Sequence, residues 1–362
     1  MLGALALVIA VGAQIGLGLL AWQHRQQAVV TTAHQAFGAL ILAGSMALAL
    51  VSGRVARARV GASPQVAAGS AAPSPAASTL GAYVELSKVR VTTMAVITTA
   101  VGFVMGSPHR LDWPRLAATL AGAFLVGAGA HALNQWYERE ADAAMRRTAH
   151  RPLPEGRLQP VQALIFGVAT AAIGVAMLAW CVNPLSSLVA LATCLSYVAL
   201  YTPMKRLTSL NTLIGAIPGA LPPLIGWSAA AGSLNVGAWV LFGILFLWQL
   251  PHFLAIALLY RDDYARAGFR MLPVVEPSGE STARQLVLYG LALVPVSLLP
   301  SVAGMAGWLY FVAALAGGCW LVAVACLAAR HRTGALARQL FLASVGYLPL
   351  LLIMMVLDRV VL

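Results

Sequence analysis

LFGILFLWQLPHFLAIALLYRDDYARAGFRMLP, residues 241–273, contains the pattern that decides the fold. Residues 241–260 contain no Asp, Glu, Lys or Arg, and Arg261 then begins a stretch with charges of both signs. A transmembrane helix needs about 20 consecutive apolar residues. A helix also satisfies its own backbone hydrogen bonds, which lipid cannot do. The stretch therefore predicts a membrane-spanning helix over 236–260, followed by a charged loop at the membrane surface.

The same pattern recurs along the chain. Of the 362 residues, 60% are hydrophobic and 9% are charged, with a mean hydropathy of +0.83, whereas soluble domains have about 25% charged residues. We therefore predict an all-α, polytopic transmembrane helical bundle. The eleven predicted spans are 2–22, 33–52, 90–107, 115–136, 160–181, 185–203, 210–231, 236–260, 285–303, 306–328 and 337–357.

The basic residues predict an orientation. The formal net charge is +12, which would suggest a nucleic-acid partner in a soluble protein. Here Lys and Arg gather before span three and after spans four, six, eight and ten, while loops 182–184, 232–235 and 304–305 carry none. This alternation follows the positive-inside rule. We expect no nucleic-acid partner, and a multi-pass protein of a bacterial inner membrane with its N-terminus and basic loops in the cytoplasm.

Two parts are separated by a linker. Residues 53–80 are rich in Ala, Ser and Pro without apolar periodicity, which is typical of a flexible connection. They divide a two-span hairpin (1–52) from a nine-span domain (81–362). The four cysteines show neither metal-ligand spacing nor a disulfide pattern.

A first acidic motif lies at the end of span four, in HALNQWYEREAD (131–142). Asn134, Glu138 and Asp142 are spaced by four residues, so a helix places them on one face, whereas Glu140 falls off that face. Ionisable groups near lipid are costly and indicate function; the alternative is an ordinary solvated helix end. Oxygen ligands suit Mg²⁺, which commonly binds through carboxylates together with substrate phosphates.

Basic residues and a second acidic motif complete the predicted site. Arg146, Arg147 and Arg151 follow the first motif and could bind phosphate, although the positive-inside rule alone also predicts arginines there. Asp262 and Asp263 follow span eight. Eight of the eleven acidic residues lie in these two loops: Glu138, Glu140, Asp142, Glu155, Asp262, Asp263, Glu276 and Glu280. We expect both carboxylate clusters to face one cavity and to hold Mg²⁺ around a pyrophosphate.

Other polar residues lie in or beside the spans. Tyr201, Lys205 and Arg206 fall together at the cytoplasmic end of span six. The Gly- and Pro-rich span seven (214–227) could open space for a bulky substrate or simply allow close packing. His252 lies inside span eight. It could be a core histidine whose hydrogen bonds are satisfied within the bundle, a heme ligand or a proton relay. Trp248 and Gln249 could line the same pocket.

Six motifs in order carry a resemblance to a family. NxxxExxxD, MRRTxxRPL, YTPMKRLTxxN, PGALPPLIGW, LWQLPHF and DDYxxxGxxMLP strongly resemble the protoheme IX farnesyltransferase (heme O synthase) family of the UbiA prenyltransferase superfamily. The resemblance covers residues 81–362. It implies transfer of the farnesyl group of farnesyl diphosphate to a vinyl group of heme B with addition of water, which yields heme O and diphosphate for the cytochrome oxidase cofactor.

The resemblance also implies roles for residues. Mg²⁺ and catalysis would fall to Asn134, Glu138, Asp142, Asp262 and Asp263. Diphosphate binding would fall to Lys88, Arg90, Arg147, Arg151, Tyr201, Lys205 and Arg206. Heme contact would fall to His252, with Trp248 and Gln249 as further candidates because they could line the same pocket. The chain departs from the family pattern at Glu138, where Asp is common, at Val89, where Pro is usual, and at His131.

The N-terminal hairpin has a separate resemblance. QIGLGLLAW (14–22) and AHQAFGALIL (33–42) resemble the last two helices of the heme A synthase family, and His34 matches a heme-ligating histidine there. The second histidine of that pair is absent, so a remnant or docking hairpin is the alternative to a cofactor site. Heme A synthase is accordingly a candidate partner.

Two rival functions remain open at this stage. One is a prenyltransferase with a quinone-precursor or chlorophyll-like acceptor. The segment LWQLPHF (247–253) argues against this alternative, because it resembles the heme branch. The other is a transporter or heme-handling scaffold. Transporters show internal repeats and midplane sites, whereas this chain shows no clear repeat and has its acidic clusters near one surface.

Overall fold

A computed structural model describes residues 79–107 and 110–361, which are built from helices and their connections with no strand in that part of the chain. Nine of these helical segments are long and apolar enough to cross a membrane. They confirm the nine spans predicted for 81–362. The two N-terminal spans, the linker up to residue 78 and His34 lie outside the described residues.

The helices follow one another with short connections. Seven spans are single helices: α4 (Val89–Gly106), α5 (Trp113–Ala144), α6 (Pro160–Cys181), α11 (Val236–Leu259), α14 (Glu280–Val302), α15 (Trp308–His331) and α16 (Gly334–Val361). Two are broken, into α7 (Pro184–Leu195), the π-helical turn η2 (Ser196–Tyr201) and α8 (Thr202–Leu207), and into α9 (Asn211–Ala220) and α10 (Pro222–Ala231). The short helices are α3 (Thr79–Leu86), α12 (Arg261–Arg266) and α13 (Leu272–Val275).

The breaks have local causes. Pro222 and Pro223 start α10, because proline cannot donate the hydrogen bond that a continuous helix would need there but is well suited to a first helical turn. The turn η2 widens the helix between α7 and α8, and such π-helical turns are frequent at functional sites. Both breaks lie in spans that flank the predicted site.

Glycines let the spans approach closely. A Cβ on Gly226 would lie 1.8 Å from the backbone oxygen of Thr99, so α10 and α4 are in backbone contact at this crossing. A Cβ on Gly129 of α5 would lie 2.6 Å from the backbone oxygen of Gly167 in α6. Small residues at crossings are typical of helix packing in membranes, where close contact replaces the hydrophobic driving force.

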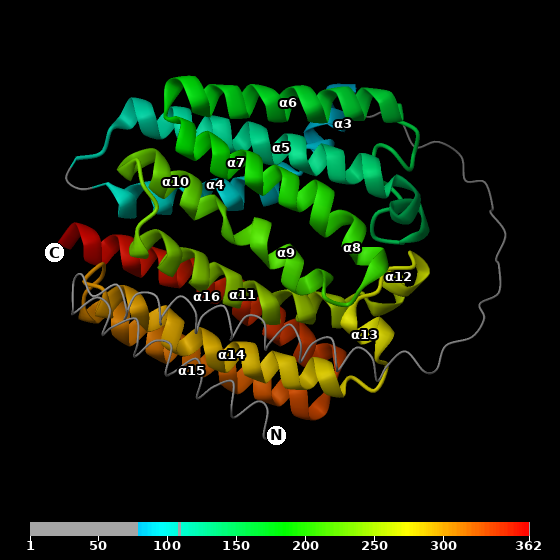
Figure 1. The fold of residues 1–362 in the computed structure, drawn as a ribbon. Coiled ribbons are helices and arrows are strands. Elements are labelled where there is room, and N and C mark those ends of the chain that lie inside the picture. The colour runs from blue at the N-terminus through cyan, green and yellow to red at the C-terminus, as the bar shows by residue number, and fades with distance from the viewer. Residues whose placement is uncertain (1–78, 108–109, 362) are drawn as a thin grey trace, which may run out of the picture. The chain divides into compact units, whose positions relative to one another are not determined.

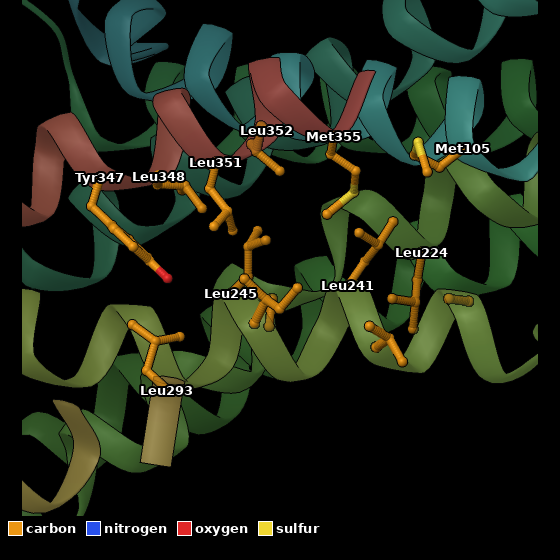
Figure 2. Packing of buried hydrophobic residues seen from close by; sticks show 14 of the residues in the cluster. Met105, Leu224, Leu241, Leu245, Leu293, Tyr347, Leu348, Leu351, Leu352 and Met355 are labelled. Carbon is orange, nitrogen blue, oxygen red and sulfur yellow. The ribbon is translucent and has the colours of Figure 1, made fainter. Parts of the chain in front are cut away.

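The main apolar core surrounds α11. In Figure 1, α11 and α16 run between α5 and α6 on one side and α14 and α15 on the other. Figure 2 shows Leu241 and Leu245 of α11 facing Leu351, Leu352 and Met355 of α16. Large apolar side chains are also exposed on the outer helices, such as Trp180 and Trp308. An apolar outer face is what contact with lipid requires.

α5 extends beyond the predicted membrane span, and this matters for the site. The span was predicted to end near 136, and the helix continues to Ala144, so the whole first acidic motif lies on one uninterrupted helix, as its spacing predicted. The end of α5, the end of α11 and the connection between α12 and α13 then meet in a small apolar cluster. This cluster contains Ala141, Met145, Ala257, Ala267, Phe269 and Met271. Both acidic motifs therefore lie at the same end of the bundle.

Candidate functional site

The first acidic motif faces the interior of the bundle. Asn134, Glu138 and Asp142 are 1%, 5% and 1% exposed, as their spacing on one helical face predicts. Glu140 is exposed, with a side chain 77% accessible, in agreement with its place off that face. Three oxygen-bearing side chains are thus buried in a row along α5, which requires compensating partners.

Each of the three side chains contacts a cation. Lys88 Nζ donates to Asn134 Oδ1 at 3.3 Å. Lys205 Nζ lies 2.8 Å from Glu138 Oε1 and 3.0 Å from Oε2. Arg151 Nη1 lies 2.7 Å from both oxygens of Asp142. With three cations against two carboxylates, the cluster has an excess of positive charge, which favours binding of an anion.

The cations come from three different segments. Lys88 precedes α4 with φ +44°, a left-handed conformation that is uncommon for residues other than glycine and marks functional or strained positions. Burial, followed by repulsion from Arg151 and Lys205, lowers the pKa of Lys88 to about 7. A bound anion would hold this ammonium in its charged form. Lys205 comes from α8, and Arg151 comes from the loop after α5.

Hydroxyl and aromatic groups surround the cluster. Asn134 Nδ2 donates to Thr202 Oγ1 at 3.1 Å, and Tyr197 OH donates to Asn134 Oδ1 at 3.4 Å. Lys205 Nζ lies 4.7 Å from the centre of the Tyr201 ring, within cation–π range. Tyr201 was predicted from sequence, whereas Tyr197 and Thr202 were missed. Tyr197 lies in the π-helical turn η2 and Thr202 follows that turn directly, and no spacing in the sequence marked this turn.

A further histidine, His131, borders the cluster. It lies one helical turn before Asn134, and its ring meets Tyr197 edge-on at 5.4 Å. Its Nδ1 is buried and has no hydrogen-bond partner in the described part of the chain. The aromatic contact fits a packing role for His131.

The second acidic motif is on α12. Asp262 is exposed, whereas Asp263, with a side chain 12% accessible, pairs with Arg266. Both carboxylates line an open hollow, which is formed by Arg146, Tyr260, Arg261, Asp262, Asp263 and Arg266. The Arg147 guanidinium lies 4.8 Å from the Tyr260 ring, so the arginines after α5 reach toward this second motif.

The two motifs are neighbours without forming one metal cluster. Within residues 79–107 and 110–361, no three His, Cys, Asp or Glu side chains converge closely enough to hold a metal ion. The expected arrangement, in which carboxylates of both motifs face one cavity, stays a prediction. Each motif instead pairs with basic residues of its own, so the assignment of Mg²⁺ ligands stays a prediction.

Two predicted basic residues lie apart from the cluster. Arg90 and Arg206 are exposed, and neither side chain has a hydrogen bond or ion pair with any other described residue. Arg147 is also exposed but stacks on Tyr260. The structure therefore brings Lys88, Arg151, Tyr201 and Lys205 to the first motif and leaves the others at the surface.

The three predicted heme contacts do not share one pocket. Gln249 Nε2 donates to the backbone oxygens of Leu245 at 2.9 Å and Ala216 at 3.4 Å, so this side chain faces α9. Trp248 and His252 instead contact α16. Gln249 therefore faces a different neighbour from Trp248 and His252, because adjacent helical residues point about 100° apart, whereas residues four apart share a face.

Comparisons with known proteins agree with this architecture. Residues 95–347 match the model of the UbiA prenyltransferase family. The chain is 51% identical over 286 residues to a Solibacter usitatus protein named protoheme IX farnesyltransferase, covering 76% of this chain and 98% of that protein. A Salinibacter ruber protein with the same name is 43% identical, again over 76% and 98%.

Solved structures share the fold at low sequence identity. A digeranylgeranylglyceryl phosphate synthase superposes with a TM-score of 0.67 at 18% identity, over 78% of this chain and 99% of that one. A UbiA homologue from Archaeoglobus fulgidus, solved with DMAPP and Mg²⁺, gives a TM-score of 0.56 at 15% identity over 77% and 99%.

Proposed function

The chain belongs to the UbiA prenyltransferase family, and we propose that it acts as a protoheme IX farnesyltransferase. It transfers the farnesyl group of farnesyl diphosphate to a vinyl group of heme B with addition of water, and releases heme O and diphosphate. The observation that carries this proposal is the 51% identity to a relative of that name over 98% of the relative's length. A quinone-type acceptor and a non-catalytic scaffold lack comparable support.

Mg²⁺ fits the donor set of the first motif. Asn134, Glu138 and Asp142 supply oxygen ligands of the kind that this hard cation prefers, and a solved family member contains Mg²⁺ with a prenyl diphosphate. When bound, the ion neutralises charge that develops on the departing diphosphate. Asp262 and Asp263 on α12 are the candidates for a second contact to metal and diphosphate.

The basic residues exchange partners when substrate binds. Lys88, Arg151 and Lys205 lie within hydrogen-bond distance of the first motif. If metal takes the carboxylates, these cations turn to the diphosphate oxygens, where their positive charge stabilises the leaving group. Because these positive charges are already in place, the side chains need little reorganisation when the bond between C1 and the diphosphate oxygen breaks.

The bond changes are balanced as follows. The allylic C1–O bond of farnesyl diphosphate breaks, and its electron pair leaves with diphosphate. C1 then bonds to the terminal carbon of the vinyl group, which leaves positive charge on the vinyl carbon next to the porphyrin. Water adds to that carbon and loses a proton. A site within the bundle keeps other water from capturing the allylic cation first.

The basic loops set the proposed orientation. Arg146, Arg147 and Arg151 follow α5, and Lys205 ends α8, so the site lies at the basic end of the spans. By the positive-inside rule this end faces the cytoplasm of a bacterial inner membrane, where farnesyl diphosphate is available as a water-soluble anion.

A product assay tests the proposal. Membranes with the overexpressed chain are incubated with heme B, farnesyl diphosphate and Mg²⁺, and the porphyrin products are analysed by mass spectrometry. We expect heme O, none after chelation of divalent ions, and far less in membranes with Asp142→Asn. A parallel incubation with a quinone precursor tests the alternative acceptor. Farnesylation of that acceptor without any farnesylated heme would overturn the proposal.

A further inference from the structure

Gln135 of α5, the residue after Asn134 of the first motif, is bonded to the backbone of α3. Its side-chain Nε2 donates to the Leu86 backbone oxygen at 2.6 Å. Gln135 is 2% exposed and Leu86 is fully buried, so water competes for neither group. Leu86 is the last residue of α3, and carbonyl oxygens at the end of a helix lack a partner within that helix. Gln135 thus supplies the partner that this buried oxygen requires.

The bond to Gln135 is made two residues before Lys88, whose φ of +44° is left-handed. Such a conformation is unfavourable for a residue with a side chain and persists where surrounding contacts enforce it. The Lys88 N–H donates to the Glu85 backbone oxygen at 3.0 Å, and Thr92 Oγ1 donates to the Ser87 backbone oxygen at 2.8 Å. Of these three hydrogen bonds, that of Gln135 ties the turn to α5.

α5 therefore holds both ends of the contact between Lys88 and the first motif. Lys88 Nζ donates to Asn134 Oδ1 at 3.3 Å, and Gln135 holds the backbone from which the Lys88 side chain extends. A lysine side chain is a flexible four-carbon stem, so a fixed backbone limits where its ammonium group can lie. Because Asn134 and Gln135 are consecutive residues of one helix, the ammonium group and the motif keep a constant separation.

Other contacts dock α3 on its outer side. Arg157 Nη2 lies 2.7 Å from Glu85 Oε2, and the Glu85 side chain is 45% accessible. Exposed ion pairs of this kind contribute little to stability. The Tyr83 ring packs against the Phe166 ring of α6 at 5.0 Å. These contacts hold the body of α3 on the bundle, whereas the Gln135 bond holds the turn beside the first motif.

We propose that Gln135 is the positioning residue for Lys88 and holds its ammonium group in reach of the diphosphate of the prenyl substrate. The inference rests on the proposed function, because that function supplies farnesyl diphosphate as the anion. With Gln135 in place, the ammonium group is ordered before the anion arrives, and a contact ordered in advance costs less on binding. Without it, the buried Leu86 oxygen has no partner, so the turn moves toward water and takes Lys88 with it.

Binding of the unreactive analogue farnesyl thiodiphosphate with Mg²⁺, measured by calorimetry on the purified full chain in detergent, tests the inference. Gln135→Met keeps the length of the side chain and removes the donor. We expect the dissociation constant of the analogue to rise by about 10-fold, the factor that corresponds to loss of one buried hydrogen bond. Gln135→Asn, whose amide is one carbon too short for this bond, is a second variant with the same expectation. An unchanged dissociation constant in both variants would overturn the inference.

A double-mutant cycle distinguishes positioning of Lys88 from general support of the fold. Lys88→Met removes the ammonium group, and Gln135→Met is then introduced in that background. If Gln135 acts through Lys88, the second substitution has no further effect on binding of the analogue, because effects that pass through one contact are not additive. A further loss of the same size in the Lys88→Met background would overturn the inference.

Glu85→Gln is the matched control on α3. It removes the exposed ion pair with Arg157 and leaves the bond between Gln135 and Leu86 in place, so we expect wild-type affinity for the analogue. A loss as large as that of Gln135→Met would assign the effect to docking of α3 and overturn the inference. The product assay on the same preparations distinguishes the two proposals. Heme O formation without coupling between Gln135 and Lys88 would overturn only this inference, and coupling in analogue binding without any farnesylated heme would overturn only the proposed function.

Discussion

Lys205 Nζ lies 2.8 Å from Glu138 Oε1, and this buried pair joins α8 to the first acidic motif of α5. Arg151 and Asp142 form a second such pair at 2.7 Å. Removing one partner of a buried pair leaves an uncompensated charge, which is strongly unfavourable. A metal ion alone would displace Lys205 and Arg151 without giving them new partners. A metal ion that arrives with diphosphate supplies an anion for both.

Metal and diphosphate are therefore expected to bind cooperatively. Mn²⁺ serves as a spectroscopic substitute for Mg²⁺, and its binding is measured by electron paramagnetic resonance with and without an unreactive farnesyl thiodiphosphate. Coupling between two ligands is typically 5–150-fold, and we expect the analogue to raise the Mn²⁺ affinity by at least about 5-fold. Lys205→Gln should reduce this coupling. Equal Mn²⁺ affinity in both conditions would contradict the exchange of partners.

Asp142→Asn should reduce turnover by about 100-fold, the order of effect seen when one electrostatic contact to a transition state is removed. The substitution keeps the shape of the side chain and removes the charge that pairs with Arg151. Turnover is measured as heme O formed per mole of chain. Glu140→Gln, on the exposed face of the same helix, is the control and should retain wild-type activity. Equal losses in both variants would point to damage of α5.

The first motif could be predicted from sequence because its information is local. The four-residue spacing of Asn134, Glu138 and Asp142 is enough to place them on one helical face. The contact of Lys88 could not be predicted, since it depends on a left-handed residue at the start of α4. Tyr197 was missed for a related reason: a regular helix through 196–201 would give it another direction than the π-helical turn does.

The sequence did not show which of the neighbouring polar residues in α11 share one helical face. Trp248 and His252 share a face because they are four residues apart, and the structure places both against Ser344. Gln249 was grouped with them by proximity in sequence, yet it faces α9. Hydropathy alone could not separate these faces, because every side of a span that is packed between other helices is apolar.

The structure also separates Asp262 from Asp263. The Asp263 side chain is turned toward the protein, where it pairs with Arg266, while Asp262 is exposed. We expect Asp263→Asn to reduce turnover more than Asp262→Asn. Both are measured at saturating farnesyl diphosphate and at low Mg²⁺, where a lost ligand has its greatest effect. The reverse order would indicate that Asp262 turns inward when substrate binds.

Gly226→Ala should prevent close packing of α10 on α4. Its new Cβ would lie 1.8 Å from the Thr99 backbone oxygen, and backbone cannot move aside as a flexible side chain can. Overpacking costs about 1–3 kcal/mol or more, so the thermal unfolding midpoint in detergent should fall. Gly346→Ala is the control, because nothing lies within 4 Å of its added Cβ. A normal midpoint for Gly226→Ala would show that the two helices can separate at little cost.

Deletion of residues 1–78 should leave farnesyl transfer intact. The contacts described for the candidate site are made among residues 79–107 and 110–361, and the family match spans 95–347. The match to the Solibacter usitatus relative covers 98% of that protein and 76% of this chain. About a quarter of this chain therefore has no counterpart in that relative. Heme O formation by the truncated chain measures the requirement, and co-purification of heme A synthase with each form measures a docking role. Loss of product with normal insertion would mean that the N-terminal residues contribute to the reaction, whereas loss of co-purification alone would assign them to the transfer of heme O to a partner.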